Sequence, residues 1–261
     1  MLTSLQYLAG FASGGLVGFV LGLVGGGGSV LAVPLLLYVV GLKDPHQAIG
    51  TSALGVAANA LAGLWSHARA QNVNWRCGCV FAGAGVMGAL GGSTLGKLVD
   101  GQSLLVLFAI LMLVVAVQMF RSRGQQGNEG AECNRDNLRK VLGFGFGTGA
   151  FSGFFGIGGG FLIVPGLVAS TSMPMYRAVG TSLVAVAAFG ITTALNYATS
   201  GLVIWALAAV FICGGVVGSL AGTRTARALA DSKGRLNMIF AAFVALVAVY
   251  VLSRSFHLVS G

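Results

Sequence analysis

The chain has 261 residues, of which 56% are hydrophobic and only 8% are charged. Soluble domains usually carry about 25% charged residues, so this composition excludes an ordinary soluble protein. The formal net charge of +9 comes from basic residues between apolar segments. Such residues set membrane topology and meet anionic headgroups of the lipid bilayer, so we expect no nucleic-acid partner. The sequence therefore predicts an all-α polytopic membrane protein.

Apolar segments alternate with charged residues and turn residues along the whole chain. A helix needs about 20 apolar residues to span a bilayer, and several segments approach that length. The predicted segments of the first half are 5–24, 29–41, 48–66, 77–97 and 103–120, and those of the second half are 141–155, 160–173, 178–199, 202–223 and 235–253. The predicted domains are a first membrane repeat, 1–120, a polar linker, 121–140, and a second membrane repeat, 141–261.

Two glycine-rich stretches interrupt the apolar segments at equivalent positions. Gly25–Pro34 reads GGGGSVLAVP, and Gly156–Pro165 reads GIGGGFLIVP. Because glycine costs about 1 kcal/mol relative to alanine inside a helix, we expect both runs to break a helix at membrane depth. Broken helices line polar cavities in transporters, and a glycine-rich helix start presents N–H groups to anions. A tight turn or close helix packing explains the same residues. The predicted helix-break residues are Gly25, Pro34, Gly156 and Pro165, and the predicted substrate-binding residues of these stretches are Gly27, Gly28, Ser29, Gly158, Gly159 and Gly160.

A second motif also recurs, because AIGTS at 48–52 returns as AVGTS at 178–182. Each copy opens an apolar segment and carries two hydroxyls, which can either donate to an anion or cap the helix start. Tryptophan, phenylalanine and glycine positions further along repeat at the same displacement, so the sequence indicates a duplication. The hydroxyl residues predicted to bind substrate are Thr51, Ser52, Thr181 and Ser182.

Four further polar residues are candidates for the transport pathway. Asn59 and Asn196 place amides deep in apolar segments. An amide without a hydrogen-bond partner is costly there, so each either joins two helices or binds substrate along the pathway. His46 and Arg177 precede the two GTS motifs. We expect them to flank opposite mouths of the pathway, with an ordinary loop residue as the alternative for each.

Basic residues predict how the two repeats are related. If the first two segments of each half return to the side where they began, twelve loop cations lie on one side and three on the other. If those segments count as one crossing, the division is eight against seven. The positive-inside rule favours the first arrangement. We therefore expect a cytoplasmic linker at 121–140, both termini outside, and inverted repeats in the cytoplasmic (inner) cell membrane. Because 141–155 is shorter than a full span, we expect re-entrant or discontinuous hairpins that meet near the bilayer midplane.

The remaining small and polar residues indicate structure rather than chemistry. Cys77 and Cys79 beside Arg76 either bind a metal or are small apolar residues at a helix end, and no further Cys or His cluster accompanies them. Glycines repeat every fourth residue in 77–97 and 202–223, which allows close helix packing and could also join two subunits of a homodimer. Away from their ends the segments contain no Asp, Glu, Lys, Arg or His. We therefore expect no enzyme activity, no metal and no cofactor.

With these paired motifs, the chain resembles the TauE/SafE family of sulfite exporter-like membrane proteins over about residues 10–253. The resemblance implies secondary export of sulfite, organosulfonates or related small anions across a bacterial-type cytoplasmic membrane. The two half-sites are chemically unequal, however. The first copy has Gly26 and Ser29 where the second has Ile157 and Gly160, and His46 stands opposite Tyr176.

We therefore expect a secondary transporter for a small sulfur-containing oxyanion that works by alternating access. Backbone amides, hydroxyls and Asn amides suit a small anionic substrate better than a bare cation, although carbonyls can also hold ions. The alternatives are a channel or permease for another small solute, and a non-transporting membrane scaffold in which the glycines only pack helices.

Overall fold

The computed structural model describes residues 3–24, 26–121, 133, 135–156, 160–228 and 245–253. Every regular element in this described part is helical, and five of its helices are long and apolar enough to cross a membrane. The predicted all-α polytopic membrane protein is therefore confirmed. The helices are α1 (Ser4–Val24), the 3₁₀ helix η1 (Gly26–Leu31), α2 (Ala32–Tyr38), α3 (Pro45–Arg69), α4 (Trp75–Leu98), α5 (Gly101–Arg121), α6 (Arg135–Phe155), α7 (Gly160–Thr171), α8 (Met175–Ala198) and α9 (Trp205–Ala228), and residues 245–253 are also helical.

Short-range capping fixes the starts of the first two long helices after the glycine run. The Asp44 carboxylate accepts a hydrogen bond from the N–H of His46 at 2.9 Å, and Pro45 takes the first helical position of α3. Its fixed φ suits that position, and its missing N–H costs nothing there. Asn74 caps α4 by accepting from the N–H of Cys77 at 3.2 Å. Both helices therefore begin slightly before the predicted segments.

The second repeat begins earlier than the sequence analysis predicted. α6 starts at Arg135 rather than near residue 141, and it has 21 residues. Arg and Lys are good helix formers, so the helix continues through charged residues that the sequence analysis assigned to the linker. At about 1.5 Å per residue, α6 is about 31 Å long. The helix is longer than predicted, but its first turns are charged and it is not among the five described helices that are apolar enough to cross a membrane. Whether this segment spans the bilayer stays a prediction.

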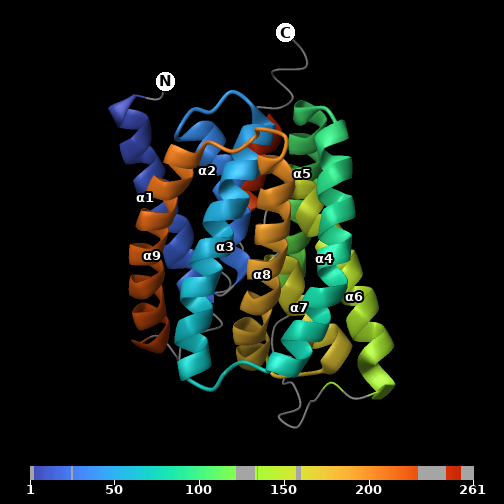
Figure 1. The fold of residues 1–261 in the computed structure, drawn as a ribbon. Helices are drawn as coiled ribbons and strands as arrows, with labels where there is room; N and C mark the ends of the chain where they lie inside the picture. Colours follow the sequence, from blue (N-terminus) through green and yellow to red (C-terminus); the bar gives the residue numbers. More distant parts are fainter. Residues whose placement is uncertain are drawn as a thin grey trace.

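Helices of the two halves pair with each other across the bundle (Figure 1). α1 packs along α9, α4 packs along α6, and α3 packs against α8 in the middle. In Figure 1, α3 runs downward where α8 runs upward, and α4 runs upward where α9 runs downward. The turns repeat as well, because Gln71 has a φ of 57° after α3 and Gly201 has a φ of 70° after α8. Equivalent helices of the two halves thus run in opposite directions. This favours an inverted relation between the halves, which stays a prediction.

Rows of glycine bring the paired helices into backbone contact. A β-carbon on Gly92 of α4 would collide with the carbonyl of Ala150 on α6, and one on Gly218 of α9 would collide with the carbonyl of Gly15 on α1. The glycine rows therefore serve packing within one chain. The predicted homodimer stays a prediction that would need another surface. The partner helices carry rows that the sequence analysis missed, namely Gly14, Gly18 and Gly22 in α1 and Gly145, Gly149 and Gly153 in α6.

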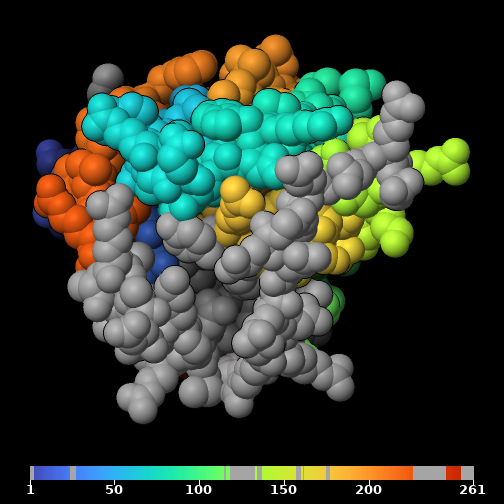
Figure 2. All heavy atoms as spheres, turned by 90° about the horizontal axis from the view of Figure 1, so that it is seen from below, coloured from blue at the N-terminus to red at the C-terminus, as the bar shows by residue number. Residues whose placement is uncertain are grey.

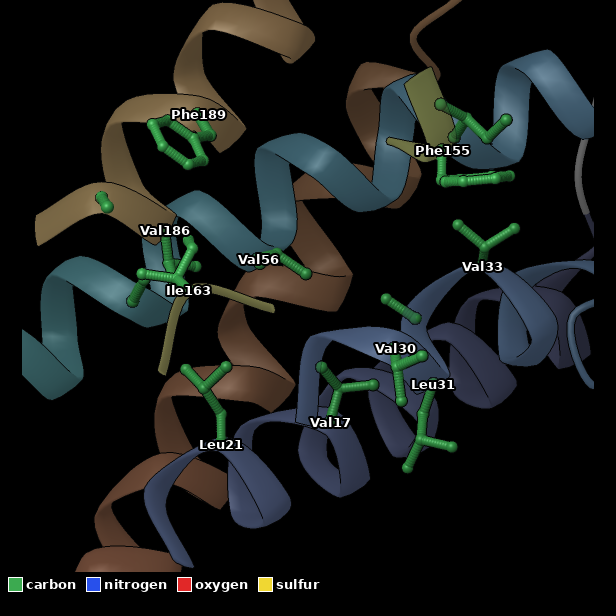
Figure 3. Packing of buried hydrophobic residues seen from close by; sticks show 14 of the residues in the cluster. Val17, Leu21, Val30, Leu31, Val33, Val56, Phe155, Ile163, Val186 and Phe189 are labelled. Atoms are coloured by element: carbon green, nitrogen blue, oxygen red, sulfur yellow. The ribbon is translucent and has the colours of Figure 1, made fainter. Parts of the chain in front are cut away.

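The buried core lies where the two glycine-broken segments meet the central helices (Figure 3). Val30 of η1, Val56 of α3 and Val186 of α8 are buried there together with Ile163 of α7. η1 also contacts α7 directly. η1, which contains most of the first glycine run, and α7, which follows the second, are therefore neighbours in the fold, while a meeting of the two runs near the bilayer midplane stays a prediction.

Candidate functional site

The two copies of the GTS motif fasten loops of the opposite half of the chain. The hydroxyl oxygen of Thr51 accepts a hydrogen bond from the N–H of Ile204, just before α9, at 3.1 Å. The hydroxyl oxygen of Thr181 accepts one from the N–H of Asn74, just before α4, at 3.0 Å. We name these contacts by their place in Figure 1: Thr51 and Ile204 form the upper clasp, and Thr181 and Asn74 form the lower clasp.

The glycine of each motif makes room for the same loop. A β-carbon on Gly180 would lie 2.5 Å from the carbonyl oxygen of Asn72, and one on Gly50 would collide with the carbonyl of Leu202. The loop between α3 and α4, which Gly180 accommodates, crosses the face of the molecule seen from below (Figure 2). The glycine of each motif leaves space for the loop, and the threonine forms a hydrogen bond with it. Each motif therefore forms a joint, that is, a contact that connects the two halves of the chain.

The serines of the motif bond within their own helices. The hydroxyl of Ser52 donates to the carbonyl of Ile49 at 3.0 Å, and that of Ser182 donates to the carbonyl of Val179 at 2.7 Å. All four predicted hydroxyl residues thus have protein partners and are fully buried. Because a hydroxyl can form more than one hydrogen bond, contact with substrate stays a prediction for them.

Substitution of the clasp threonines tests their structural role. We expect Thr181→Val to lower stability by about 1 kcal/mol, because the partly buried N–H of Asn74 loses its acceptor. Thr181→Ser keeps the oxygen and should stay close to wild type, and the same pair at Thr51 should behave alike. Thermal unfolding of the purified protein in detergent measures the difference. Equal stability of the valine and serine variants would mean that packing alone holds the loops.

The described helix break lies at Gly156, and the prediction that Pro34 and Pro165 break helices was wrong, because both lie inside helices. Gly156 follows α6 with a φ of 66°, a left-handed conformation that favours glycine. Pro34 lies in the first turn of α2, where its missing N–H is tolerated. Pro165 lies inside α7, and neighbouring helices can satisfy the backbone groups that a proline frees in a membrane helix. The predicted residues Gly25, Gly158 and Gly159 lie outside the described part of the chain.

The described residues of the glycine stretches pack tightly against the core. A β-carbon on Gly28 would lie 2.9 Å from the Cα atom of Leu21, so this glycine allows η1 to approach α1. Ser29 is fully buried and has a contact partner. Gly27 belongs to η1, and Gly160 is the first residue of α7. Close packing, the second explanation in the sequence analysis, holds for Gly28, and substrate binding by these residues stays a prediction.

The amide of Asn59 is a buried polar group whose oxygen and nitrogen both lack a hydrogen-bond partner in the described core. Asn59 is fully buried in the middle of α3 and faces Gly215 of α9, where a β-carbon would collide with its amide. Neither its oxygen nor its nitrogen has a hydrogen-bond partner in the described part of the chain. In the other half, Phe189 stands at the equivalent place against Gly85. The polar group therefore exists in one half only.

Several buried hydroxyls, like the amide of Asn59, have no hydrogen-bond partner in the described part of the chain. An unpaired buried polar group costs about 1–3 kcal/mol, so each one requires an explanation. The described hydroxyls that are buried without a partner are those of Ser13, Ser152, Thr193 and Tyr197.

Asn196 belongs to a polar network at the ends of α4 and α8. Its side-chain oxygen and its backbone carbonyl accept hydrogen bonds from the ammonium group of Lys97 at 2.8 and 3.1 Å. The same ammonium donates to Ser200 at 3.0 Å, and the Asn196 amide donates to Ser93 and Thr94. Asn196 therefore joins two helices, one of the two roles that the sequence analysis left open. Lys97 places a positive charge at the C-terminus of α8, where the helix dipole favours it.

A pocket of about 710 Å³ opens where α3 begins, at the top of the bundle in Figure 1. His46, one of the two predicted mouth residues, lines this pocket. Arg177, the other, is exposed near the start of α8, toward the opposite end of the bundle. The charged residues that line the pocket are Lys43, Asp44, Lys97 and Asp100. They balance in sign, so the pocket by itself does not select anions.

These features define a class: a polytopic helical membrane protein whose apolar core retains unpaired polar groups. The family model named Sulfite exporter TauE/SafE matches residues 10–251 of the chain. The chain therefore belongs to the TauE/SafE family of membrane transporters.

Curated relatives agree with this assignment. A probable membrane transporter protein of Xylella fastidiosa is 51% identical over 257 residues, which cover 97% of this chain and 98% of the relative. The probable membrane transporter protein YdhB of Bacillus subtilis is 27% identical over 217 residues, covering 80% of this chain and 86% of the relative. A probable membrane transporter protein of Methanocaldococcus jannaschii is 30% identical over 194 residues, covering 71% of each chain. No solved structure matches the chain.

Proposed function

We propose that the protein is a secondary transporter that exports a small sulfur-containing oxyanion, such as sulfite or an organosulfonate, by alternating access. The description of the family supports the substrate class, since it names sulfite export. The relatives are described as probable membrane transporters, and their names give no substrate.

The observation that carries the proposal is the unpaired amide of Asn59 in the buried core. Its nitrogen can donate to an oxyanion, and a hydrogen bond to a charged group contributes about 1.5–3 kcal/mol. Neutral donors of this kind hold an anion with modest affinity, roughly micromolar to millimolar. Such an affinity lets a transported solute leave as well as enter.

The pairing of the helices supports alternating access. Each half contributes one helix to each outer pair, α1 with α9 and α4 with α6, and each half fastens a loop of the other through a clasp. A rocking motion between two such interlocked halves exposes a central site to one side and then to the other.

A flux assay on purified protein in liposomes tests the function directly. We expect labelled sulfite to cross faster than in empty liposomes, and sulfoacetate and thiosulfate to compete, while monovalent cations do not. Running the assay with and without a pH gradient determines the coupling. Competition by cations without competition by oxyanions would exclude the anion transporter and favour a carrier of another solute.

We further propose that the lower end of the bundle and the linker at 121–140 face the cytoplasm, because loop cations concentrate there. Two exposed loop residues at equivalent places, Ala70 below and Thr199 above, allow a matched test. In intact cells, a membrane-impermeant thiol reagent should label a cysteine at position 199 and miss one at position 70, each introduced into a cysteine-free variant. Labelling with the opposite pattern would reverse the orientation.

A further inference from the structure

A disulfide connects the start of α4, beside the lower clasp, to the linker. Cys77 lies in the first turn of α4, and Cys133 precedes α6 by two residues. Their Cα atoms are 5.4 Å apart, although 56 positions separate them in the chain. The sequence predicted that Cys77 and Cys79 are either a metal site or small apolar residues at a helix end. The structure corrects this for Cys77, while Cys79 is a free, exposed thiol.

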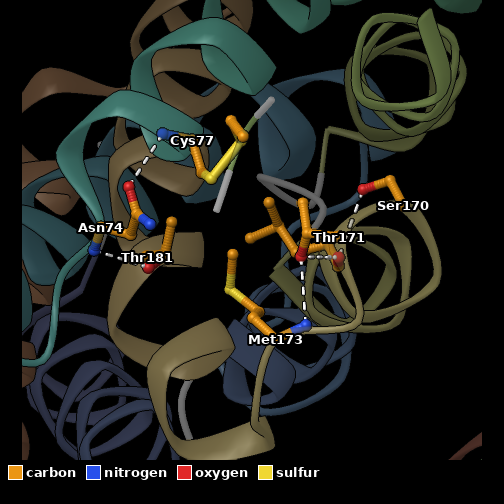
Figure 4. The surroundings of a disulfide bond; sticks show 8 residues. Asn74, Cys77, Ser170, Thr171, Met173 and Thr181 are labelled. Atoms are coloured by element: carbon orange, nitrogen blue, oxygen red, sulfur yellow. Dashed lines mark hydrogen bonds between the residues drawn. A yellow bond between two sulfur atoms is a disulfide. The ribbon is translucent and has the colours of Figure 1, made fainter. Parts of the chain in front are cut away.

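Hydrogen bonds link this disulfide to the joint between the halves (Figure 4). The N–H of Cys77 donates to the side chain of Asn74 at 3.2 Å, and the N–H of Asn74 donates to Thr181 at 3.0 Å. The upper clasp has no such bond, because Leu207 stands where the repeat would place the equivalent of Cys77. The disulfide therefore lies beside one of the two clasps only.

The proposed orientation places this disulfide on the cytoplasmic side. Arg76 directly precedes Cys77, and Arg135 and Arg139 follow Cys133. The cytosol keeps thiols reduced, so disulfides that form there are usually transient and redox-sensing or catalytic. The distribution of cations indicates that this end of the bundle faces the cytosol, and a permanent structural disulfide is not expected there.

We propose that Cys77 and Cys133 form a reversible thiol–disulfide site that small cytoplasmic disulfides oxidise and small dithiols reduce. In the oxidising direction, the thiolate of one cysteine attacks a small disulfide, forms a mixed disulfide and releases one small thiolate. The second cysteine then attacks the protein sulfur of that mixed disulfide and releases the other small thiolate. Both protein thiols lose their protons, and the two small thiolates take them up. The two electrons pass to the small disulfide.

The formed bond is shielded from solvent. Cys77 is 0% exposed and Cys133 is 4% exposed. Thiol–disulfide exchange depends on access to the sulfurs, so a shielded bond exchanges slowly. Slow exchange suits a response to sustained oxidation.

The bond should slow transport. It ties Cys133, between the two halves, to the first turn of α4, next to the residue Asn74 that Thr181 of the second half already holds. This inference rests on the proposed transport function, because alternating access requires movement at this joint. We expect the oxidised protein to transport sulfite at least threefold more slowly than the reduced protein.

The state of the thiols in cells is the first test, and it does not depend on transport. The variant Cys79→Ser with Cys213→Ser retains only the proposed pair. A permeant alkylating reagent, followed by mass spectrometry, should find both thiols reduced in unstressed cells and bonded after treatment with diamide. Complete bonding in unstressed cells would overturn both the reversible site and the cytoplasmic orientation. Absence of the bond after diamide would overturn the site alone.

Flux is the second test. Liposomes containing the Cys79→Ser, Cys213→Ser protein should transport sulfite faster after dithiothreitol than after diamide. The variant Cys77→Ala with Cys133→Ala should give one rate under both treatments, and Cys133→Ala alone serves if the double variant does not fold. If flux is the same after both treatments in the protein that retains the cysteine pair, the regulatory role is overturned. The proposed transport function is not affected by that result. If neither redox state moves sulfite, the proposed function fails, while the thiol measurement in cells still decides the site.

Discussion

Replacing Gly92 by alanine should remove most of the folded protein, whereas replacing its neighbour Gly91 should leave stability near that of the wild type. A β-carbon at Gly92 would collide with the carbonyl of Ala150 on α6, and a backbone carbonyl cannot move aside as a flexible side chain does. At Gly91 nothing lies within 4 Å of that β-carbon. Overpacking of a core typically costs 1–3 kcal/mol and occasionally more, and a clash with backbone belongs at the upper end.

The two glycines form a matched pair, because both lie inside α4 and alanine raises helix propensity at each by about 1 kcal/mol. Fluorescence-detected gel filtration and thermal unfolding in detergent should show a large loss for Gly92→Ala only. A second pair on α6 provides an independent check, since Gly149 touches the backbone of Gly85 and Gly147 has open space. Equal effects at Gly91 and Gly92 would mean that the helices pack through side chains, contrary to the structure.

Alanine substitutions in the glycine runs affect packing as well as any anion site. A β-carbon on Gly28 would meet the backbone of α1, so Gly28→Ala should lose flux through misfolding even if no anion touches this residue. Loss of transport there does not separate anion binding from packing. A variant informs on the site only where its stability is measured alongside its flux.

Helix positions and the duplication could be read from the sequence, because apolar length and repeated motifs are local signals. α3 and α4 begin only two or three residues before their predicted segments. α6 was misjudged because charge was taken as the end of a helix, although Arg139 and Lys140 lie inside it. The family was also evident from the paired motifs, and the family model confirms it.

Contacts between the halves could not be predicted from such local signals in the sequence. Spacing says nothing about the pairing of Cys77 with Cys133, and the position of Asn196 in an apolar segment does not reveal Lys97 as its partner. The sequence predicted that the GTS hydroxyls would cap their own helix or donate to an anion, whereas the threonines accept hydrogen bonds from loops of the other half. Only the fold shows that the N–H bonded by Thr181 belongs to the opposite half.

Asn59→Leu should keep or raise the stability of the protein and reduce its sulfite flux at least tenfold. Leucine has nearly the shape of asparagine, and replacing an unpaired buried amide by an apolar group removes a cost of about 1–3 kcal/mol. The same replacement removes the donor that we propose for the substrate. A residue that only joined helices would behave in the opposite way, because its loss would lower stability first and flux only as a result.

Phe189→Leu supplies the control, since Phe189 packs against Gly85 as Asn59 packs against Gly215. That variant should lose stability through a cavity, by an amount within the roughly 0.5–3 kcal/mol typical of single substitutions, and should retain flux in the folded fraction. Thermal unfolding and liposome flux on the same preparations separate the two cases. If Asn59→Leu is destabilised and still transports sulfite at the wild-type rate, the amide serves the fold. The proposal would then lose the observation that carries it. If stability is retained while flux falls, the unpaired amide of Asn59 serves substrate binding rather than the stability of the fold.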